Sequence, residues 1–248
     1  YLEDFKQKDL HTRFQLNKAP LWRFRLFKIS DKEYLFFMTI LHAIIDGWSS
    51  AVFLTELENR IAEQKNTAIL LTGALKTHHK DYVAEQLAIV NDDSYKQFWK
   101  DTMLDYQRTS LPFSATAVQP ANIKAVSREM DEVLFSSLEK RAKEYGVSLK
   151  TMHLAAYALV LKYTTGQQDI TFGIETNSRP DMEDSDQLVG CFLNTIPFRI
   201  NTEQVSTVGK FIRQVAQLER NLKAYDKLPL SEIVRICEEE TLSGGNPF

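Results

Sequence analysis

The sequence lacks the features of a secreted, membrane-spanning or nucleic-acid-binding protein. Its 248 residues include only two cysteines, which cannot form a disulfide framework and favour a reduced, cytoplasmic setting. No apolar run approaches the ~20 residues needed to span a bilayer. The 30 lysines and arginines are outnumbered by 33 acidic residues, so there is no basic surplus for nucleic acid. We therefore expect a cytoplasmic globular protein with neither a membrane nor a nucleic-acid partner.

Glycine and proline are also scarce, with 9 and 7 residues, so regular helices and strands should dominate. The N-terminal residues YLEDFKQKD lack the basic and apolar regions of a signal peptide. The composition, with 44% apolar and 25% charged residues, is typical of a globular protein. At about 150 residues per domain, the length predicts one or two domains.

The first third of the chain predicts two strands followed by a helix. Residues 21–28 alternate apolar and charged side chains, the period of a half-buried strand. Residues 33–41 are nearly all apolar, which predicts a central strand covered on both faces. From Trp48 onward, apolar residues recur at helical spacing, with Asp46 or Ser49 as the expected N-cap.

The rest of the chain predicts strands alternating with helices. We expect helices at 81–90, 94–104, 132–145, 148–164 and 205–224, and strands near 123–131, 169–175 and 194–200. Residues 105–122 contain two prolines and show no period, which marks a boundary. The pattern predicts a two-lobed α/β sandwich, with lobes at residues 1–110 and 123–248 and a linker at 111–122.

His42 is the histidine that could carry chemistry. It stands where an apolar strand ends, just before Asp46 and Gly47. Burying a titratable imidazole there costs free energy unless the side chain faces a cavity or forms hydrogen bonds. The residues alone leave open a second interpretation, in which a neighbouring carbonyl satisfies His42 and Asp46 is an ordinary cap. No metal site is expected, because the pair at residues 78–79 has no cysteine or further histidine at ligand spacing.

The segment around His42 belongs to a longer series of motifs. Residues 41–49, LHAIIDGWS, resemble the HHxxxDGxS core of the condensation domains of nonribosomal peptide synthetases, with Leu41 in place of the first histidine. Other segments resemble the family's remaining motifs in order: 19–23 (PLxR), 79–83 (YxDFAxW), 166–173 with 178–180 (GQxDxxxG and GRP), 189–195 (VGxFxNT), 225–230 (QDYPFE) and 246–248 (RNPxF). The family's first two motifs have no counterpart, so we expect a condensation domain without its two ends.

The resemblance implies a fold and a reaction. The family fold is a V of two lobes similar to chloramphenicol acetyltransferase, with a tunnel along their interface. Donor and acceptor carrier proteins insert phosphopantetheine arms into it, and the acceptor amine attacks the donor thioester to form an amide. The expected partners are therefore carrier proteins and neighbouring adenylation domains of a peptide antibiotic synthetase. No cofactor bound by the chain itself is expected.

The resemblance also implies roles for the residues of the core motif. His42 would lie within the tunnel, orient the amine and accept its proton, while the Gly47 backbone N–H would stabilise the oxyanion. Asp46 would be structural, in a salt bridge with Arg179 or with an arginine upstream of this sequence. Leu41 removes one hydrogen-bonding group but leaves the proposed catalytic nitrogen in place.

Four further residues are expected near the substrate or the tunnel: Trp48, Ser49, Asn194 and Thr195. They favour a peptide-bond-forming subtype over an epimerization domain, and the absence of a DxxxxD core disfavours a cyclizing one.

Two other functions remain open. One is a stand-alone acyltransferase of the same superfamily that uses coenzyme A or a carrier. The other is a non-catalytic domain that only docks partner proteins, a reading to which Leu41 gives some weight.

Overall fold

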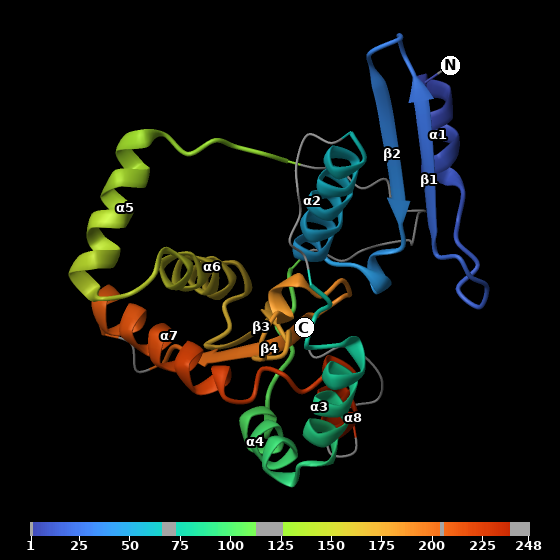
Figure 1. The fold of residues 1–248 in the computed structure, drawn as a ribbon. Coiled ribbons are helices and arrows are strands. Elements are labelled where there is room, and N and C mark those ends of the chain that lie inside the picture. The colour runs from blue at the N-terminus through green and yellow to red at the C-terminus, as the bar shows by residue number, and fades with distance from the viewer. Residues whose placement is uncertain (1, 66–72, 113–125, 204–205, 239–248) are drawn as a thin grey trace. The chain divides into compact units, whose positions relative to one another are not determined.

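The computed structural model describes residues 2–65, 73–112, 126–203 and 206–238 (Figure 1). Packing divides the chain into two compact units: the first comprises residues 1–85 and 178–193, and the second residues 86–177 and 194–248. No helix in the described ranges is long and apolar enough to cross a membrane.

The lobes expected at residues 1–110 and 123–248 remain a prediction. Most of the expected linker at 111–122 lies outside the described residues, which end at 112 and resume at 126. Packing places residues 86–110 in the second unit, and it places residues 178–193, from late in the chain, in the first.

The first unit is built on an antiparallel hairpin. Its elements are α1 (Leu2–His11), β1 (Trp22–Lys28), β2 (Tyr34–Ile40), the 3-10 turn η1 (His42–Ile44), α2 (Gly47–Gln64), the start of α3 (His79–Asn91) and the 3-10 turn η2 (Ser185–Gln187). The register pairs Trp22 with Ile40 and Lys28 with Tyr34. Since neighbouring side chains of a strand point to opposite faces, the hairpin offers apolar residues to both sides.

One helix contacts each face of this hairpin (Figure 1). The ring of Phe5 in α1 lies 5.0 Å from that of Phe27 and meets it edge to face. On the opposite face, the ring of Phe53 in α2 lies 5.5 Å from that of Phe24. The aromatic pairs therefore place β1 between two helices.

The expectation that β2 is a central strand covered on both faces was wrong. In the described part of the chain its only hydrogen-bonded neighbour is β1. Its first three residues are exposed, with Tyr34 55% exposed, whereas residues 37–40 are half-buried. Burial on β2 is therefore confined to the part of the strand that leads into η1.

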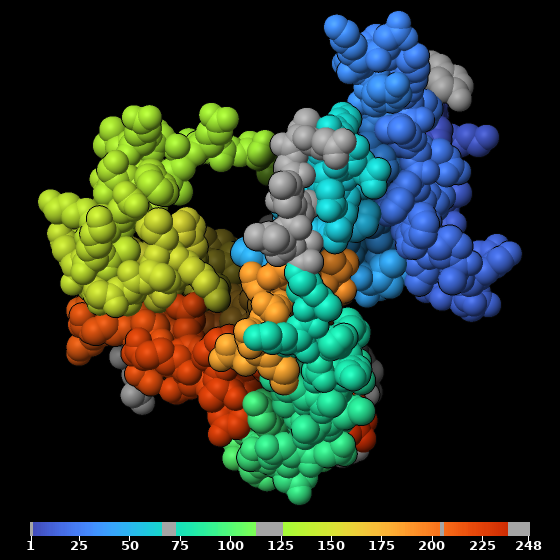
Figure 2. Space-filling model, viewed as in Figure 1, coloured from blue at the N-terminus to red at the C-terminus, as the bar shows by residue number. Residues whose placement is uncertain are grey.

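The second unit contains most of the buried apolar side chains. Its elements are the end of α3, α4 (Asp93–Met103), α5 (Glu132–Tyr145), α6 (Leu149–Thr165), β3 (Asp169–Asn177), β4 (Leu193–Asn201), α7 (Val208–Lys223) and α8 (Leu230–Glu238). Strands β3 and β4 are hydrogen-bonded neighbours, and alternate residues of both strands enter one core with α6 and α7. Helices α5, α6 and α7 pack against one another, as Figures 1 and 2 show.

Most of the helix and strand predictions are confirmed, and the exceptions are specific. Glycines with positive φ, Gly146 and Gly166, end α5 and α6 where the sequence predicts a stop. The strand expected near residues 123–131 is absent from its described part, residues 126–131, where Val126 and Met130 are exposed. The sequence did not predict α1 or α8.

Candidate active site

The candidate site begins where β2 ends. His42 opens the turn η1, and its side chain is exposed and makes no hydrogen bond to any described residue. Leu41, before it, is half-buried, and its backbone N–H donates to the carbonyl of Leu21 at 3.0 Å. The His42 imidazole is thus exposed where the chain leaves the hairpin.

Asp46 caps the helix that follows, and it is only 4% exposed. Its Oδ1 accepts from the backbone N–H of Ser49 at 2.7 Å, and its Oδ2 from that of Phe192 at 3.0 Å. Burial alone would raise the pKa of this carboxyl, but the hydrogen bonds from Ser49 and Phe192 outweigh that effect and lower the pKa. Asp46 is therefore an ionised, fully engaged N-cap.

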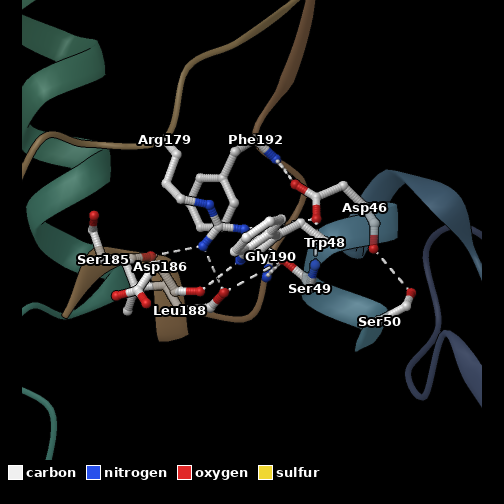
Figure 3. Close-up of polar contacts among 10 residues, drawn as sticks. All are labelled: Asp46, Trp48, Ser49, Ser50, Arg179, Ser185, Asp186, Leu188, Gly190 and Phe192. Atoms are coloured by element: carbon white, nitrogen blue, oxygen red, sulfur yellow. Dashed lines mark hydrogen bonds and ion pairs between the residues drawn. The ribbon is translucent and has the colours of Figure 1, made fainter. Parts of the chain in front are cut away.

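Arg179 is the partner that the structure places beside Asp46. Its Nη2 lies 3.7 Å from Asp46 Oδ1, and its side chain is 9% exposed. The guanidinium N–H groups donate elsewhere: Nη1 to the carbonyls of Ser185 and Leu188 at 2.7 and 2.8 Å, and Nη2 to Ser49 Oγ at 3.0 Å. Arg179 therefore binds the 185–188 segment as well as forming an ion pair with Asp46 (Figure 3).

Ser49 lies inside this cluster and is fully buried. Its Oγ accepts from the backbone N–H of Gly190 at 3.1 Å, while the carbonyl of Gly190 accepts from the N–H of Asp46 at 3.0 Å. The sequence placed Ser49 near the substrate. The structure places it between α2 and residues 188–190, where its hydroxyl holds the two together.

Trp48 and Gly47 are the exposed part of the helix start. The Trp48 side chain is 61% exposed, and its Nε1 donates to the carbonyl of Asp186 at 2.7 Å. The backbone N–H groups of Ser49 and Ser50 are taken by Asp46. Those of Gly47 and Trp48 donate to none of the described residues. They are the two donors that the N-terminus of α2 leaves available.

Asn194 and Thr195 lie on β4, in the second unit. The Asn194 side-chain N–H₂ donates to the carbonyls of Asp226 and Leu228 at 2.9 and 2.7 Å, and its oxygen accepts from the N–H of Leu230 at 3.1 Å. These bonds join β4 to the segment that leads into α8. Thr195 is half-buried.

The structure adds Gly190 and Phe192 to the site residues inferred from the sequence. Both lie in residues 189–195, which resemble a family motif, but the sequence predicts a place in the site only for the last two residues of that motif. In the part of the chain that the structure describes, no group of three or more His, Cys, Asp or Glu side chains is placed to hold a metal ion.

Comparisons with known proteins agree with this geometry. The family model of the condensation domain matches residues 1–248. The chain is 29% identical over 243 residues to tyrocidine synthase 3 from Brevibacillus parabrevis, and 25% identical over 232 residues to malpibaldin synthetase from Mortierella alpina. These matches cover 95% and 91% of this chain, but only 4% of each of the two synthetases.

Solved structures share the fold. The X-domain from teicoplanin biosynthesis matches with a TM-score of 0.82 at 19% identity, over 99% of this chain and 57% of that one. VibH, a condensation enzyme, matches with a TM-score of 0.74 at 20% identity, over 98% of this chain and 56% of that one. The α/β, chloramphenicol acetyltransferase-like fold expected from the sequence is therefore confirmed. From the capped HxxxDG turn and the match over its full length, we conclude that the chain belongs to the condensation domain family of nonribosomal peptide synthetases.

Proposed function

We propose that this chain forms amide bonds by joining an acyl or peptidyl group from one carrier protein to the amine of an aminoacyl group on another. Condensation domains of nonribosomal peptide synthetases are amide-bond-forming acyltransferases that act with carrier-bound phosphopantetheine. The observation that supports this proposal most directly is the exposed His42 imidazole, next to a helix start that is held by the buried Asp46.

His42 serves as the proton acceptor in this proposal. The attacking amine has an ordinary pKa near 8, so much of it is already neutral, and a strong base is unnecessary. The C–N bond forms as the amine adds to the thioester carbonyl, and the nitrogen passes its proton to the imidazole. The C–S bond then breaks, and the proton is returned to the departing thiolate. Holding the two reactants in place supplies up to about 7–11 kcal/mol of the lowered barrier.

The start of α2 stabilises the negative charge that develops on the carbonyl oxygen. The backbone N–H groups of Gly47 and Trp48 are free of bonds to described residues, and the positive end of the helix dipole lies at the same place. Preorganised N–H donors of this kind are an effective oxyanion site when water is excluded.

Asp46 does not act as a second member of a catalytic pair with His42. Each of its carboxylate oxygens already accepts a backbone hydrogen bond, and Arg179 lies beside it. A carboxylate committed in this way orients the helix start, and it is not free to polarise an imidazole.

The substrates and partners follow from the same proposal. The donor and acceptor are carrier proteins bearing phosphopantetheine thioesters, and adenylation domains load them. The curated relatives are peptide synthetases many times longer than this chain, which supports a place within a multidomain synthetase.

Replacing His42 in the whole protein tests the proposal. With a loaded donor and a loaded acceptor carrier, His42→Ala should abolish dipeptide formation, while the matched control His153→Ala should keep it. His153 is also exposed, but it lies on α6, where its Nδ1 contacts the carbonyl of Leu149 at 2.7 Å. Undiminished product from His42→Ala would refute the role of His42.

The choice of acceptor separates the alternatives. A stand-alone acyltransferase would use a free amine as readily as a carrier-bound one, whereas the proposed enzyme requires the loaded carrier. Absence of product from the unsubstituted protein would instead favour the non-catalytic docking domain.

A further inference from the structure

The start of α2 is held by a segment that follows it by more than 130 residues. Every buried residue that the structure describes in the first unit lies within residues 45–49, at Thr77, or within residues 178–192. The segment 178–192 exchanges backbone and side-chain hydrogen bonds with Asp46 and Ser49 in both directions. The local order of the candidate site therefore depends on this segment.

Within this contact, Arg179 does more than pair with Asp46. The 3.7 Å separation from Asp46 Oδ1 is too long for a hydrogen bond, and the hydrogen bonds from Ser49 and Phe192 lower the pKa of Asp46 more than the charge of Arg179 does. Its N–H groups instead donate hydrogen bonds to the carbonyls of Ser185 and Leu188 and to the hydroxyl of Ser49. Arg179 thus organises the segment around the helix start.

The guanidinium of Arg179 packs on the ring of Phe192. The guanidinium carbon lies 4.1 Å from the centroid of the ring, in cation–π geometry (Figure 3). The ring is itself fully buried and meets that of Tyr82 edge to face at 4.9 Å. The guanidinium therefore has a fixed, desolvated platform.

Phe192 combines two contacts with the site in one residue. Its ring supports Arg179, and its backbone N–H donates to Asp46. Gly190 allows this close approach, because a Cβ there would lie 3.0 Å from the Phe192 ring. We propose that Phe192 is a positioning residue for the reaction at His42: it acts through Arg179 and Asp46 to hold the first turn of α2, with its free N–H groups, against the His42 turn. This inference rests on the proposed function.

The leucine variant isolates the contribution of the ring. Phe192→Leu keeps the backbone N–H and an apolar side chain, but it removes the platform under Arg179. In the whole protein, we expect kcat for amide formation to fall about tenfold, with KM for the acceptor carrier changed less than about twofold, because small misplacements of reacting groups mainly affect the chemical step. Hydrogen exchange at the N–H groups of Asp46 and Ser49 should become faster.

Phe198→Leu is the matched control. Phe198 is also fully buried, but it lies on β4 in the second unit, where its ring packs against that of Phe172. We expect this variant to lower the thermal midpoint while leaving kcat per folded molecule unchanged. If Phe192→Leu shows that same pattern, Phe192 is a packing residue only and the proposal is overturned.

A double-mutant cycle with Arg179→Lys tests whether Phe192 acts through Arg179. If the two residues form one unit, kcat of the double variant should lie within about twofold of the lower single variant. Losses that multiply to about a hundredfold would show independent roles and overturn the proposal.

A parallel measurement on His42→Ala separates the positioning role of Phe192 from the proposed function. If His42→Ala is inactive while Phe192→Leu keeps full kcat, the positioning role fails and the proposed function stands. If His42→Ala keeps full activity, the proposed function fails and the positioning role fails with it.

Discussion

The backbone N–H of Phe192 donates to Oδ2 of Asp46 over 3.0 Å, although 146 residues separate them along the chain. Asp46 caps α2 through its other oxygen, so a single carboxylate joins a local helix start to a distant segment. The HxxxDG turn is consequently complete only when residues 178–193 have folded onto it. This dependence leads to measurable effects of pH and of substitution.

The Asp46 carboxylate should make stability depend on acid pH. Its pKa is lower in the folded protein than the ordinary value near 3.9, so its stabilising effect is fully present above that ordinary pKa. The effect is lost as the pH falls through the lower, folded-state pKa. Unfolding free energy measured from pH 7 down to pH 2 should show this loss in the natural sequence and a smaller one in Asp46→Asn. Identical pH profiles for the two proteins would contradict the assignment.

Gly190→Ala should disturb the contact between Phe192 and Asp46. An added Cβ would lie 3.0 and 3.1 Å from two atoms of the Phe192 ring and 3.2 Å from Cδ2 of His79. We expect a loss of about 1–3 kcal/mol in unfolding free energy, the usual cost of overpacking. Gly73→Ala is the control, because its Cβ would meet nothing within 4 Å. Equal stability of the two variants would show that the segment adjusts freely.

Asn194 should prove to be a structural cross-link of the second unit. Asn194→Ala leaves the carbonyl of the buried Leu228 without its donor, and we expect a loss of about 1–3 kcal/mol. Asn194→Asp should cost more, because it places a negative charge beside two carbonyl oxygens. The exposed Asn221→Ala provides the comparison, and chemical denaturation gives all three values. An aspartate variant as stable as the natural sequence would rule out this role.

The ion pair between Arg199 and Asp169 should depend on the shape of the guanidinium. Arg199 Nε and Nη2 bind Asp169 Oδ2 at 2.9 and 2.6 Å, and its Nη1 donates to the carbonyl of Leu104 at 2.6 Å. A lysine cannot reproduce this fork, so Arg199→Lys should lower the unfolding free energy by about 1–3 kcal/mol.

Arg141→Lys tests the same change at the protein surface. Arg141 pairs with Glu144 at 2.7 Å, and its side chain is exposed, so the substitution should cost less than about 0.5 kcal/mol. Equal losses at the two arginines, measured by thermal unfolding, would show that charge alone sets the stability at position 199.

Much of the fold was predictable because its signals are local. The stop signals at Gly146 and Gly166 lie within a few residues of the helix ends that they define. The Asp46 cap is equally local, since it acts on Ser49, three residues away. The limited burial of β2 was not predictable, because the sequence pattern of an apolar run is the same whether one or two strands pair with it.

The sequence by itself determined the family, the α/β fold and the identity of the candidate residues His42, Asp46 and Gly47, because these depend on short motifs and local periods. Only the tertiary structure decided what surrounds them. It placed Arg179 beside Asp46, buried Ser49 within the contact, and supported the guanidinium on Phe192. The physical reason is distance along the chain: the contacts that Asp46 and Ser49 make with residues 179–192 join positions more than 100 residues apart, and no local propensity or period encodes which of them will meet.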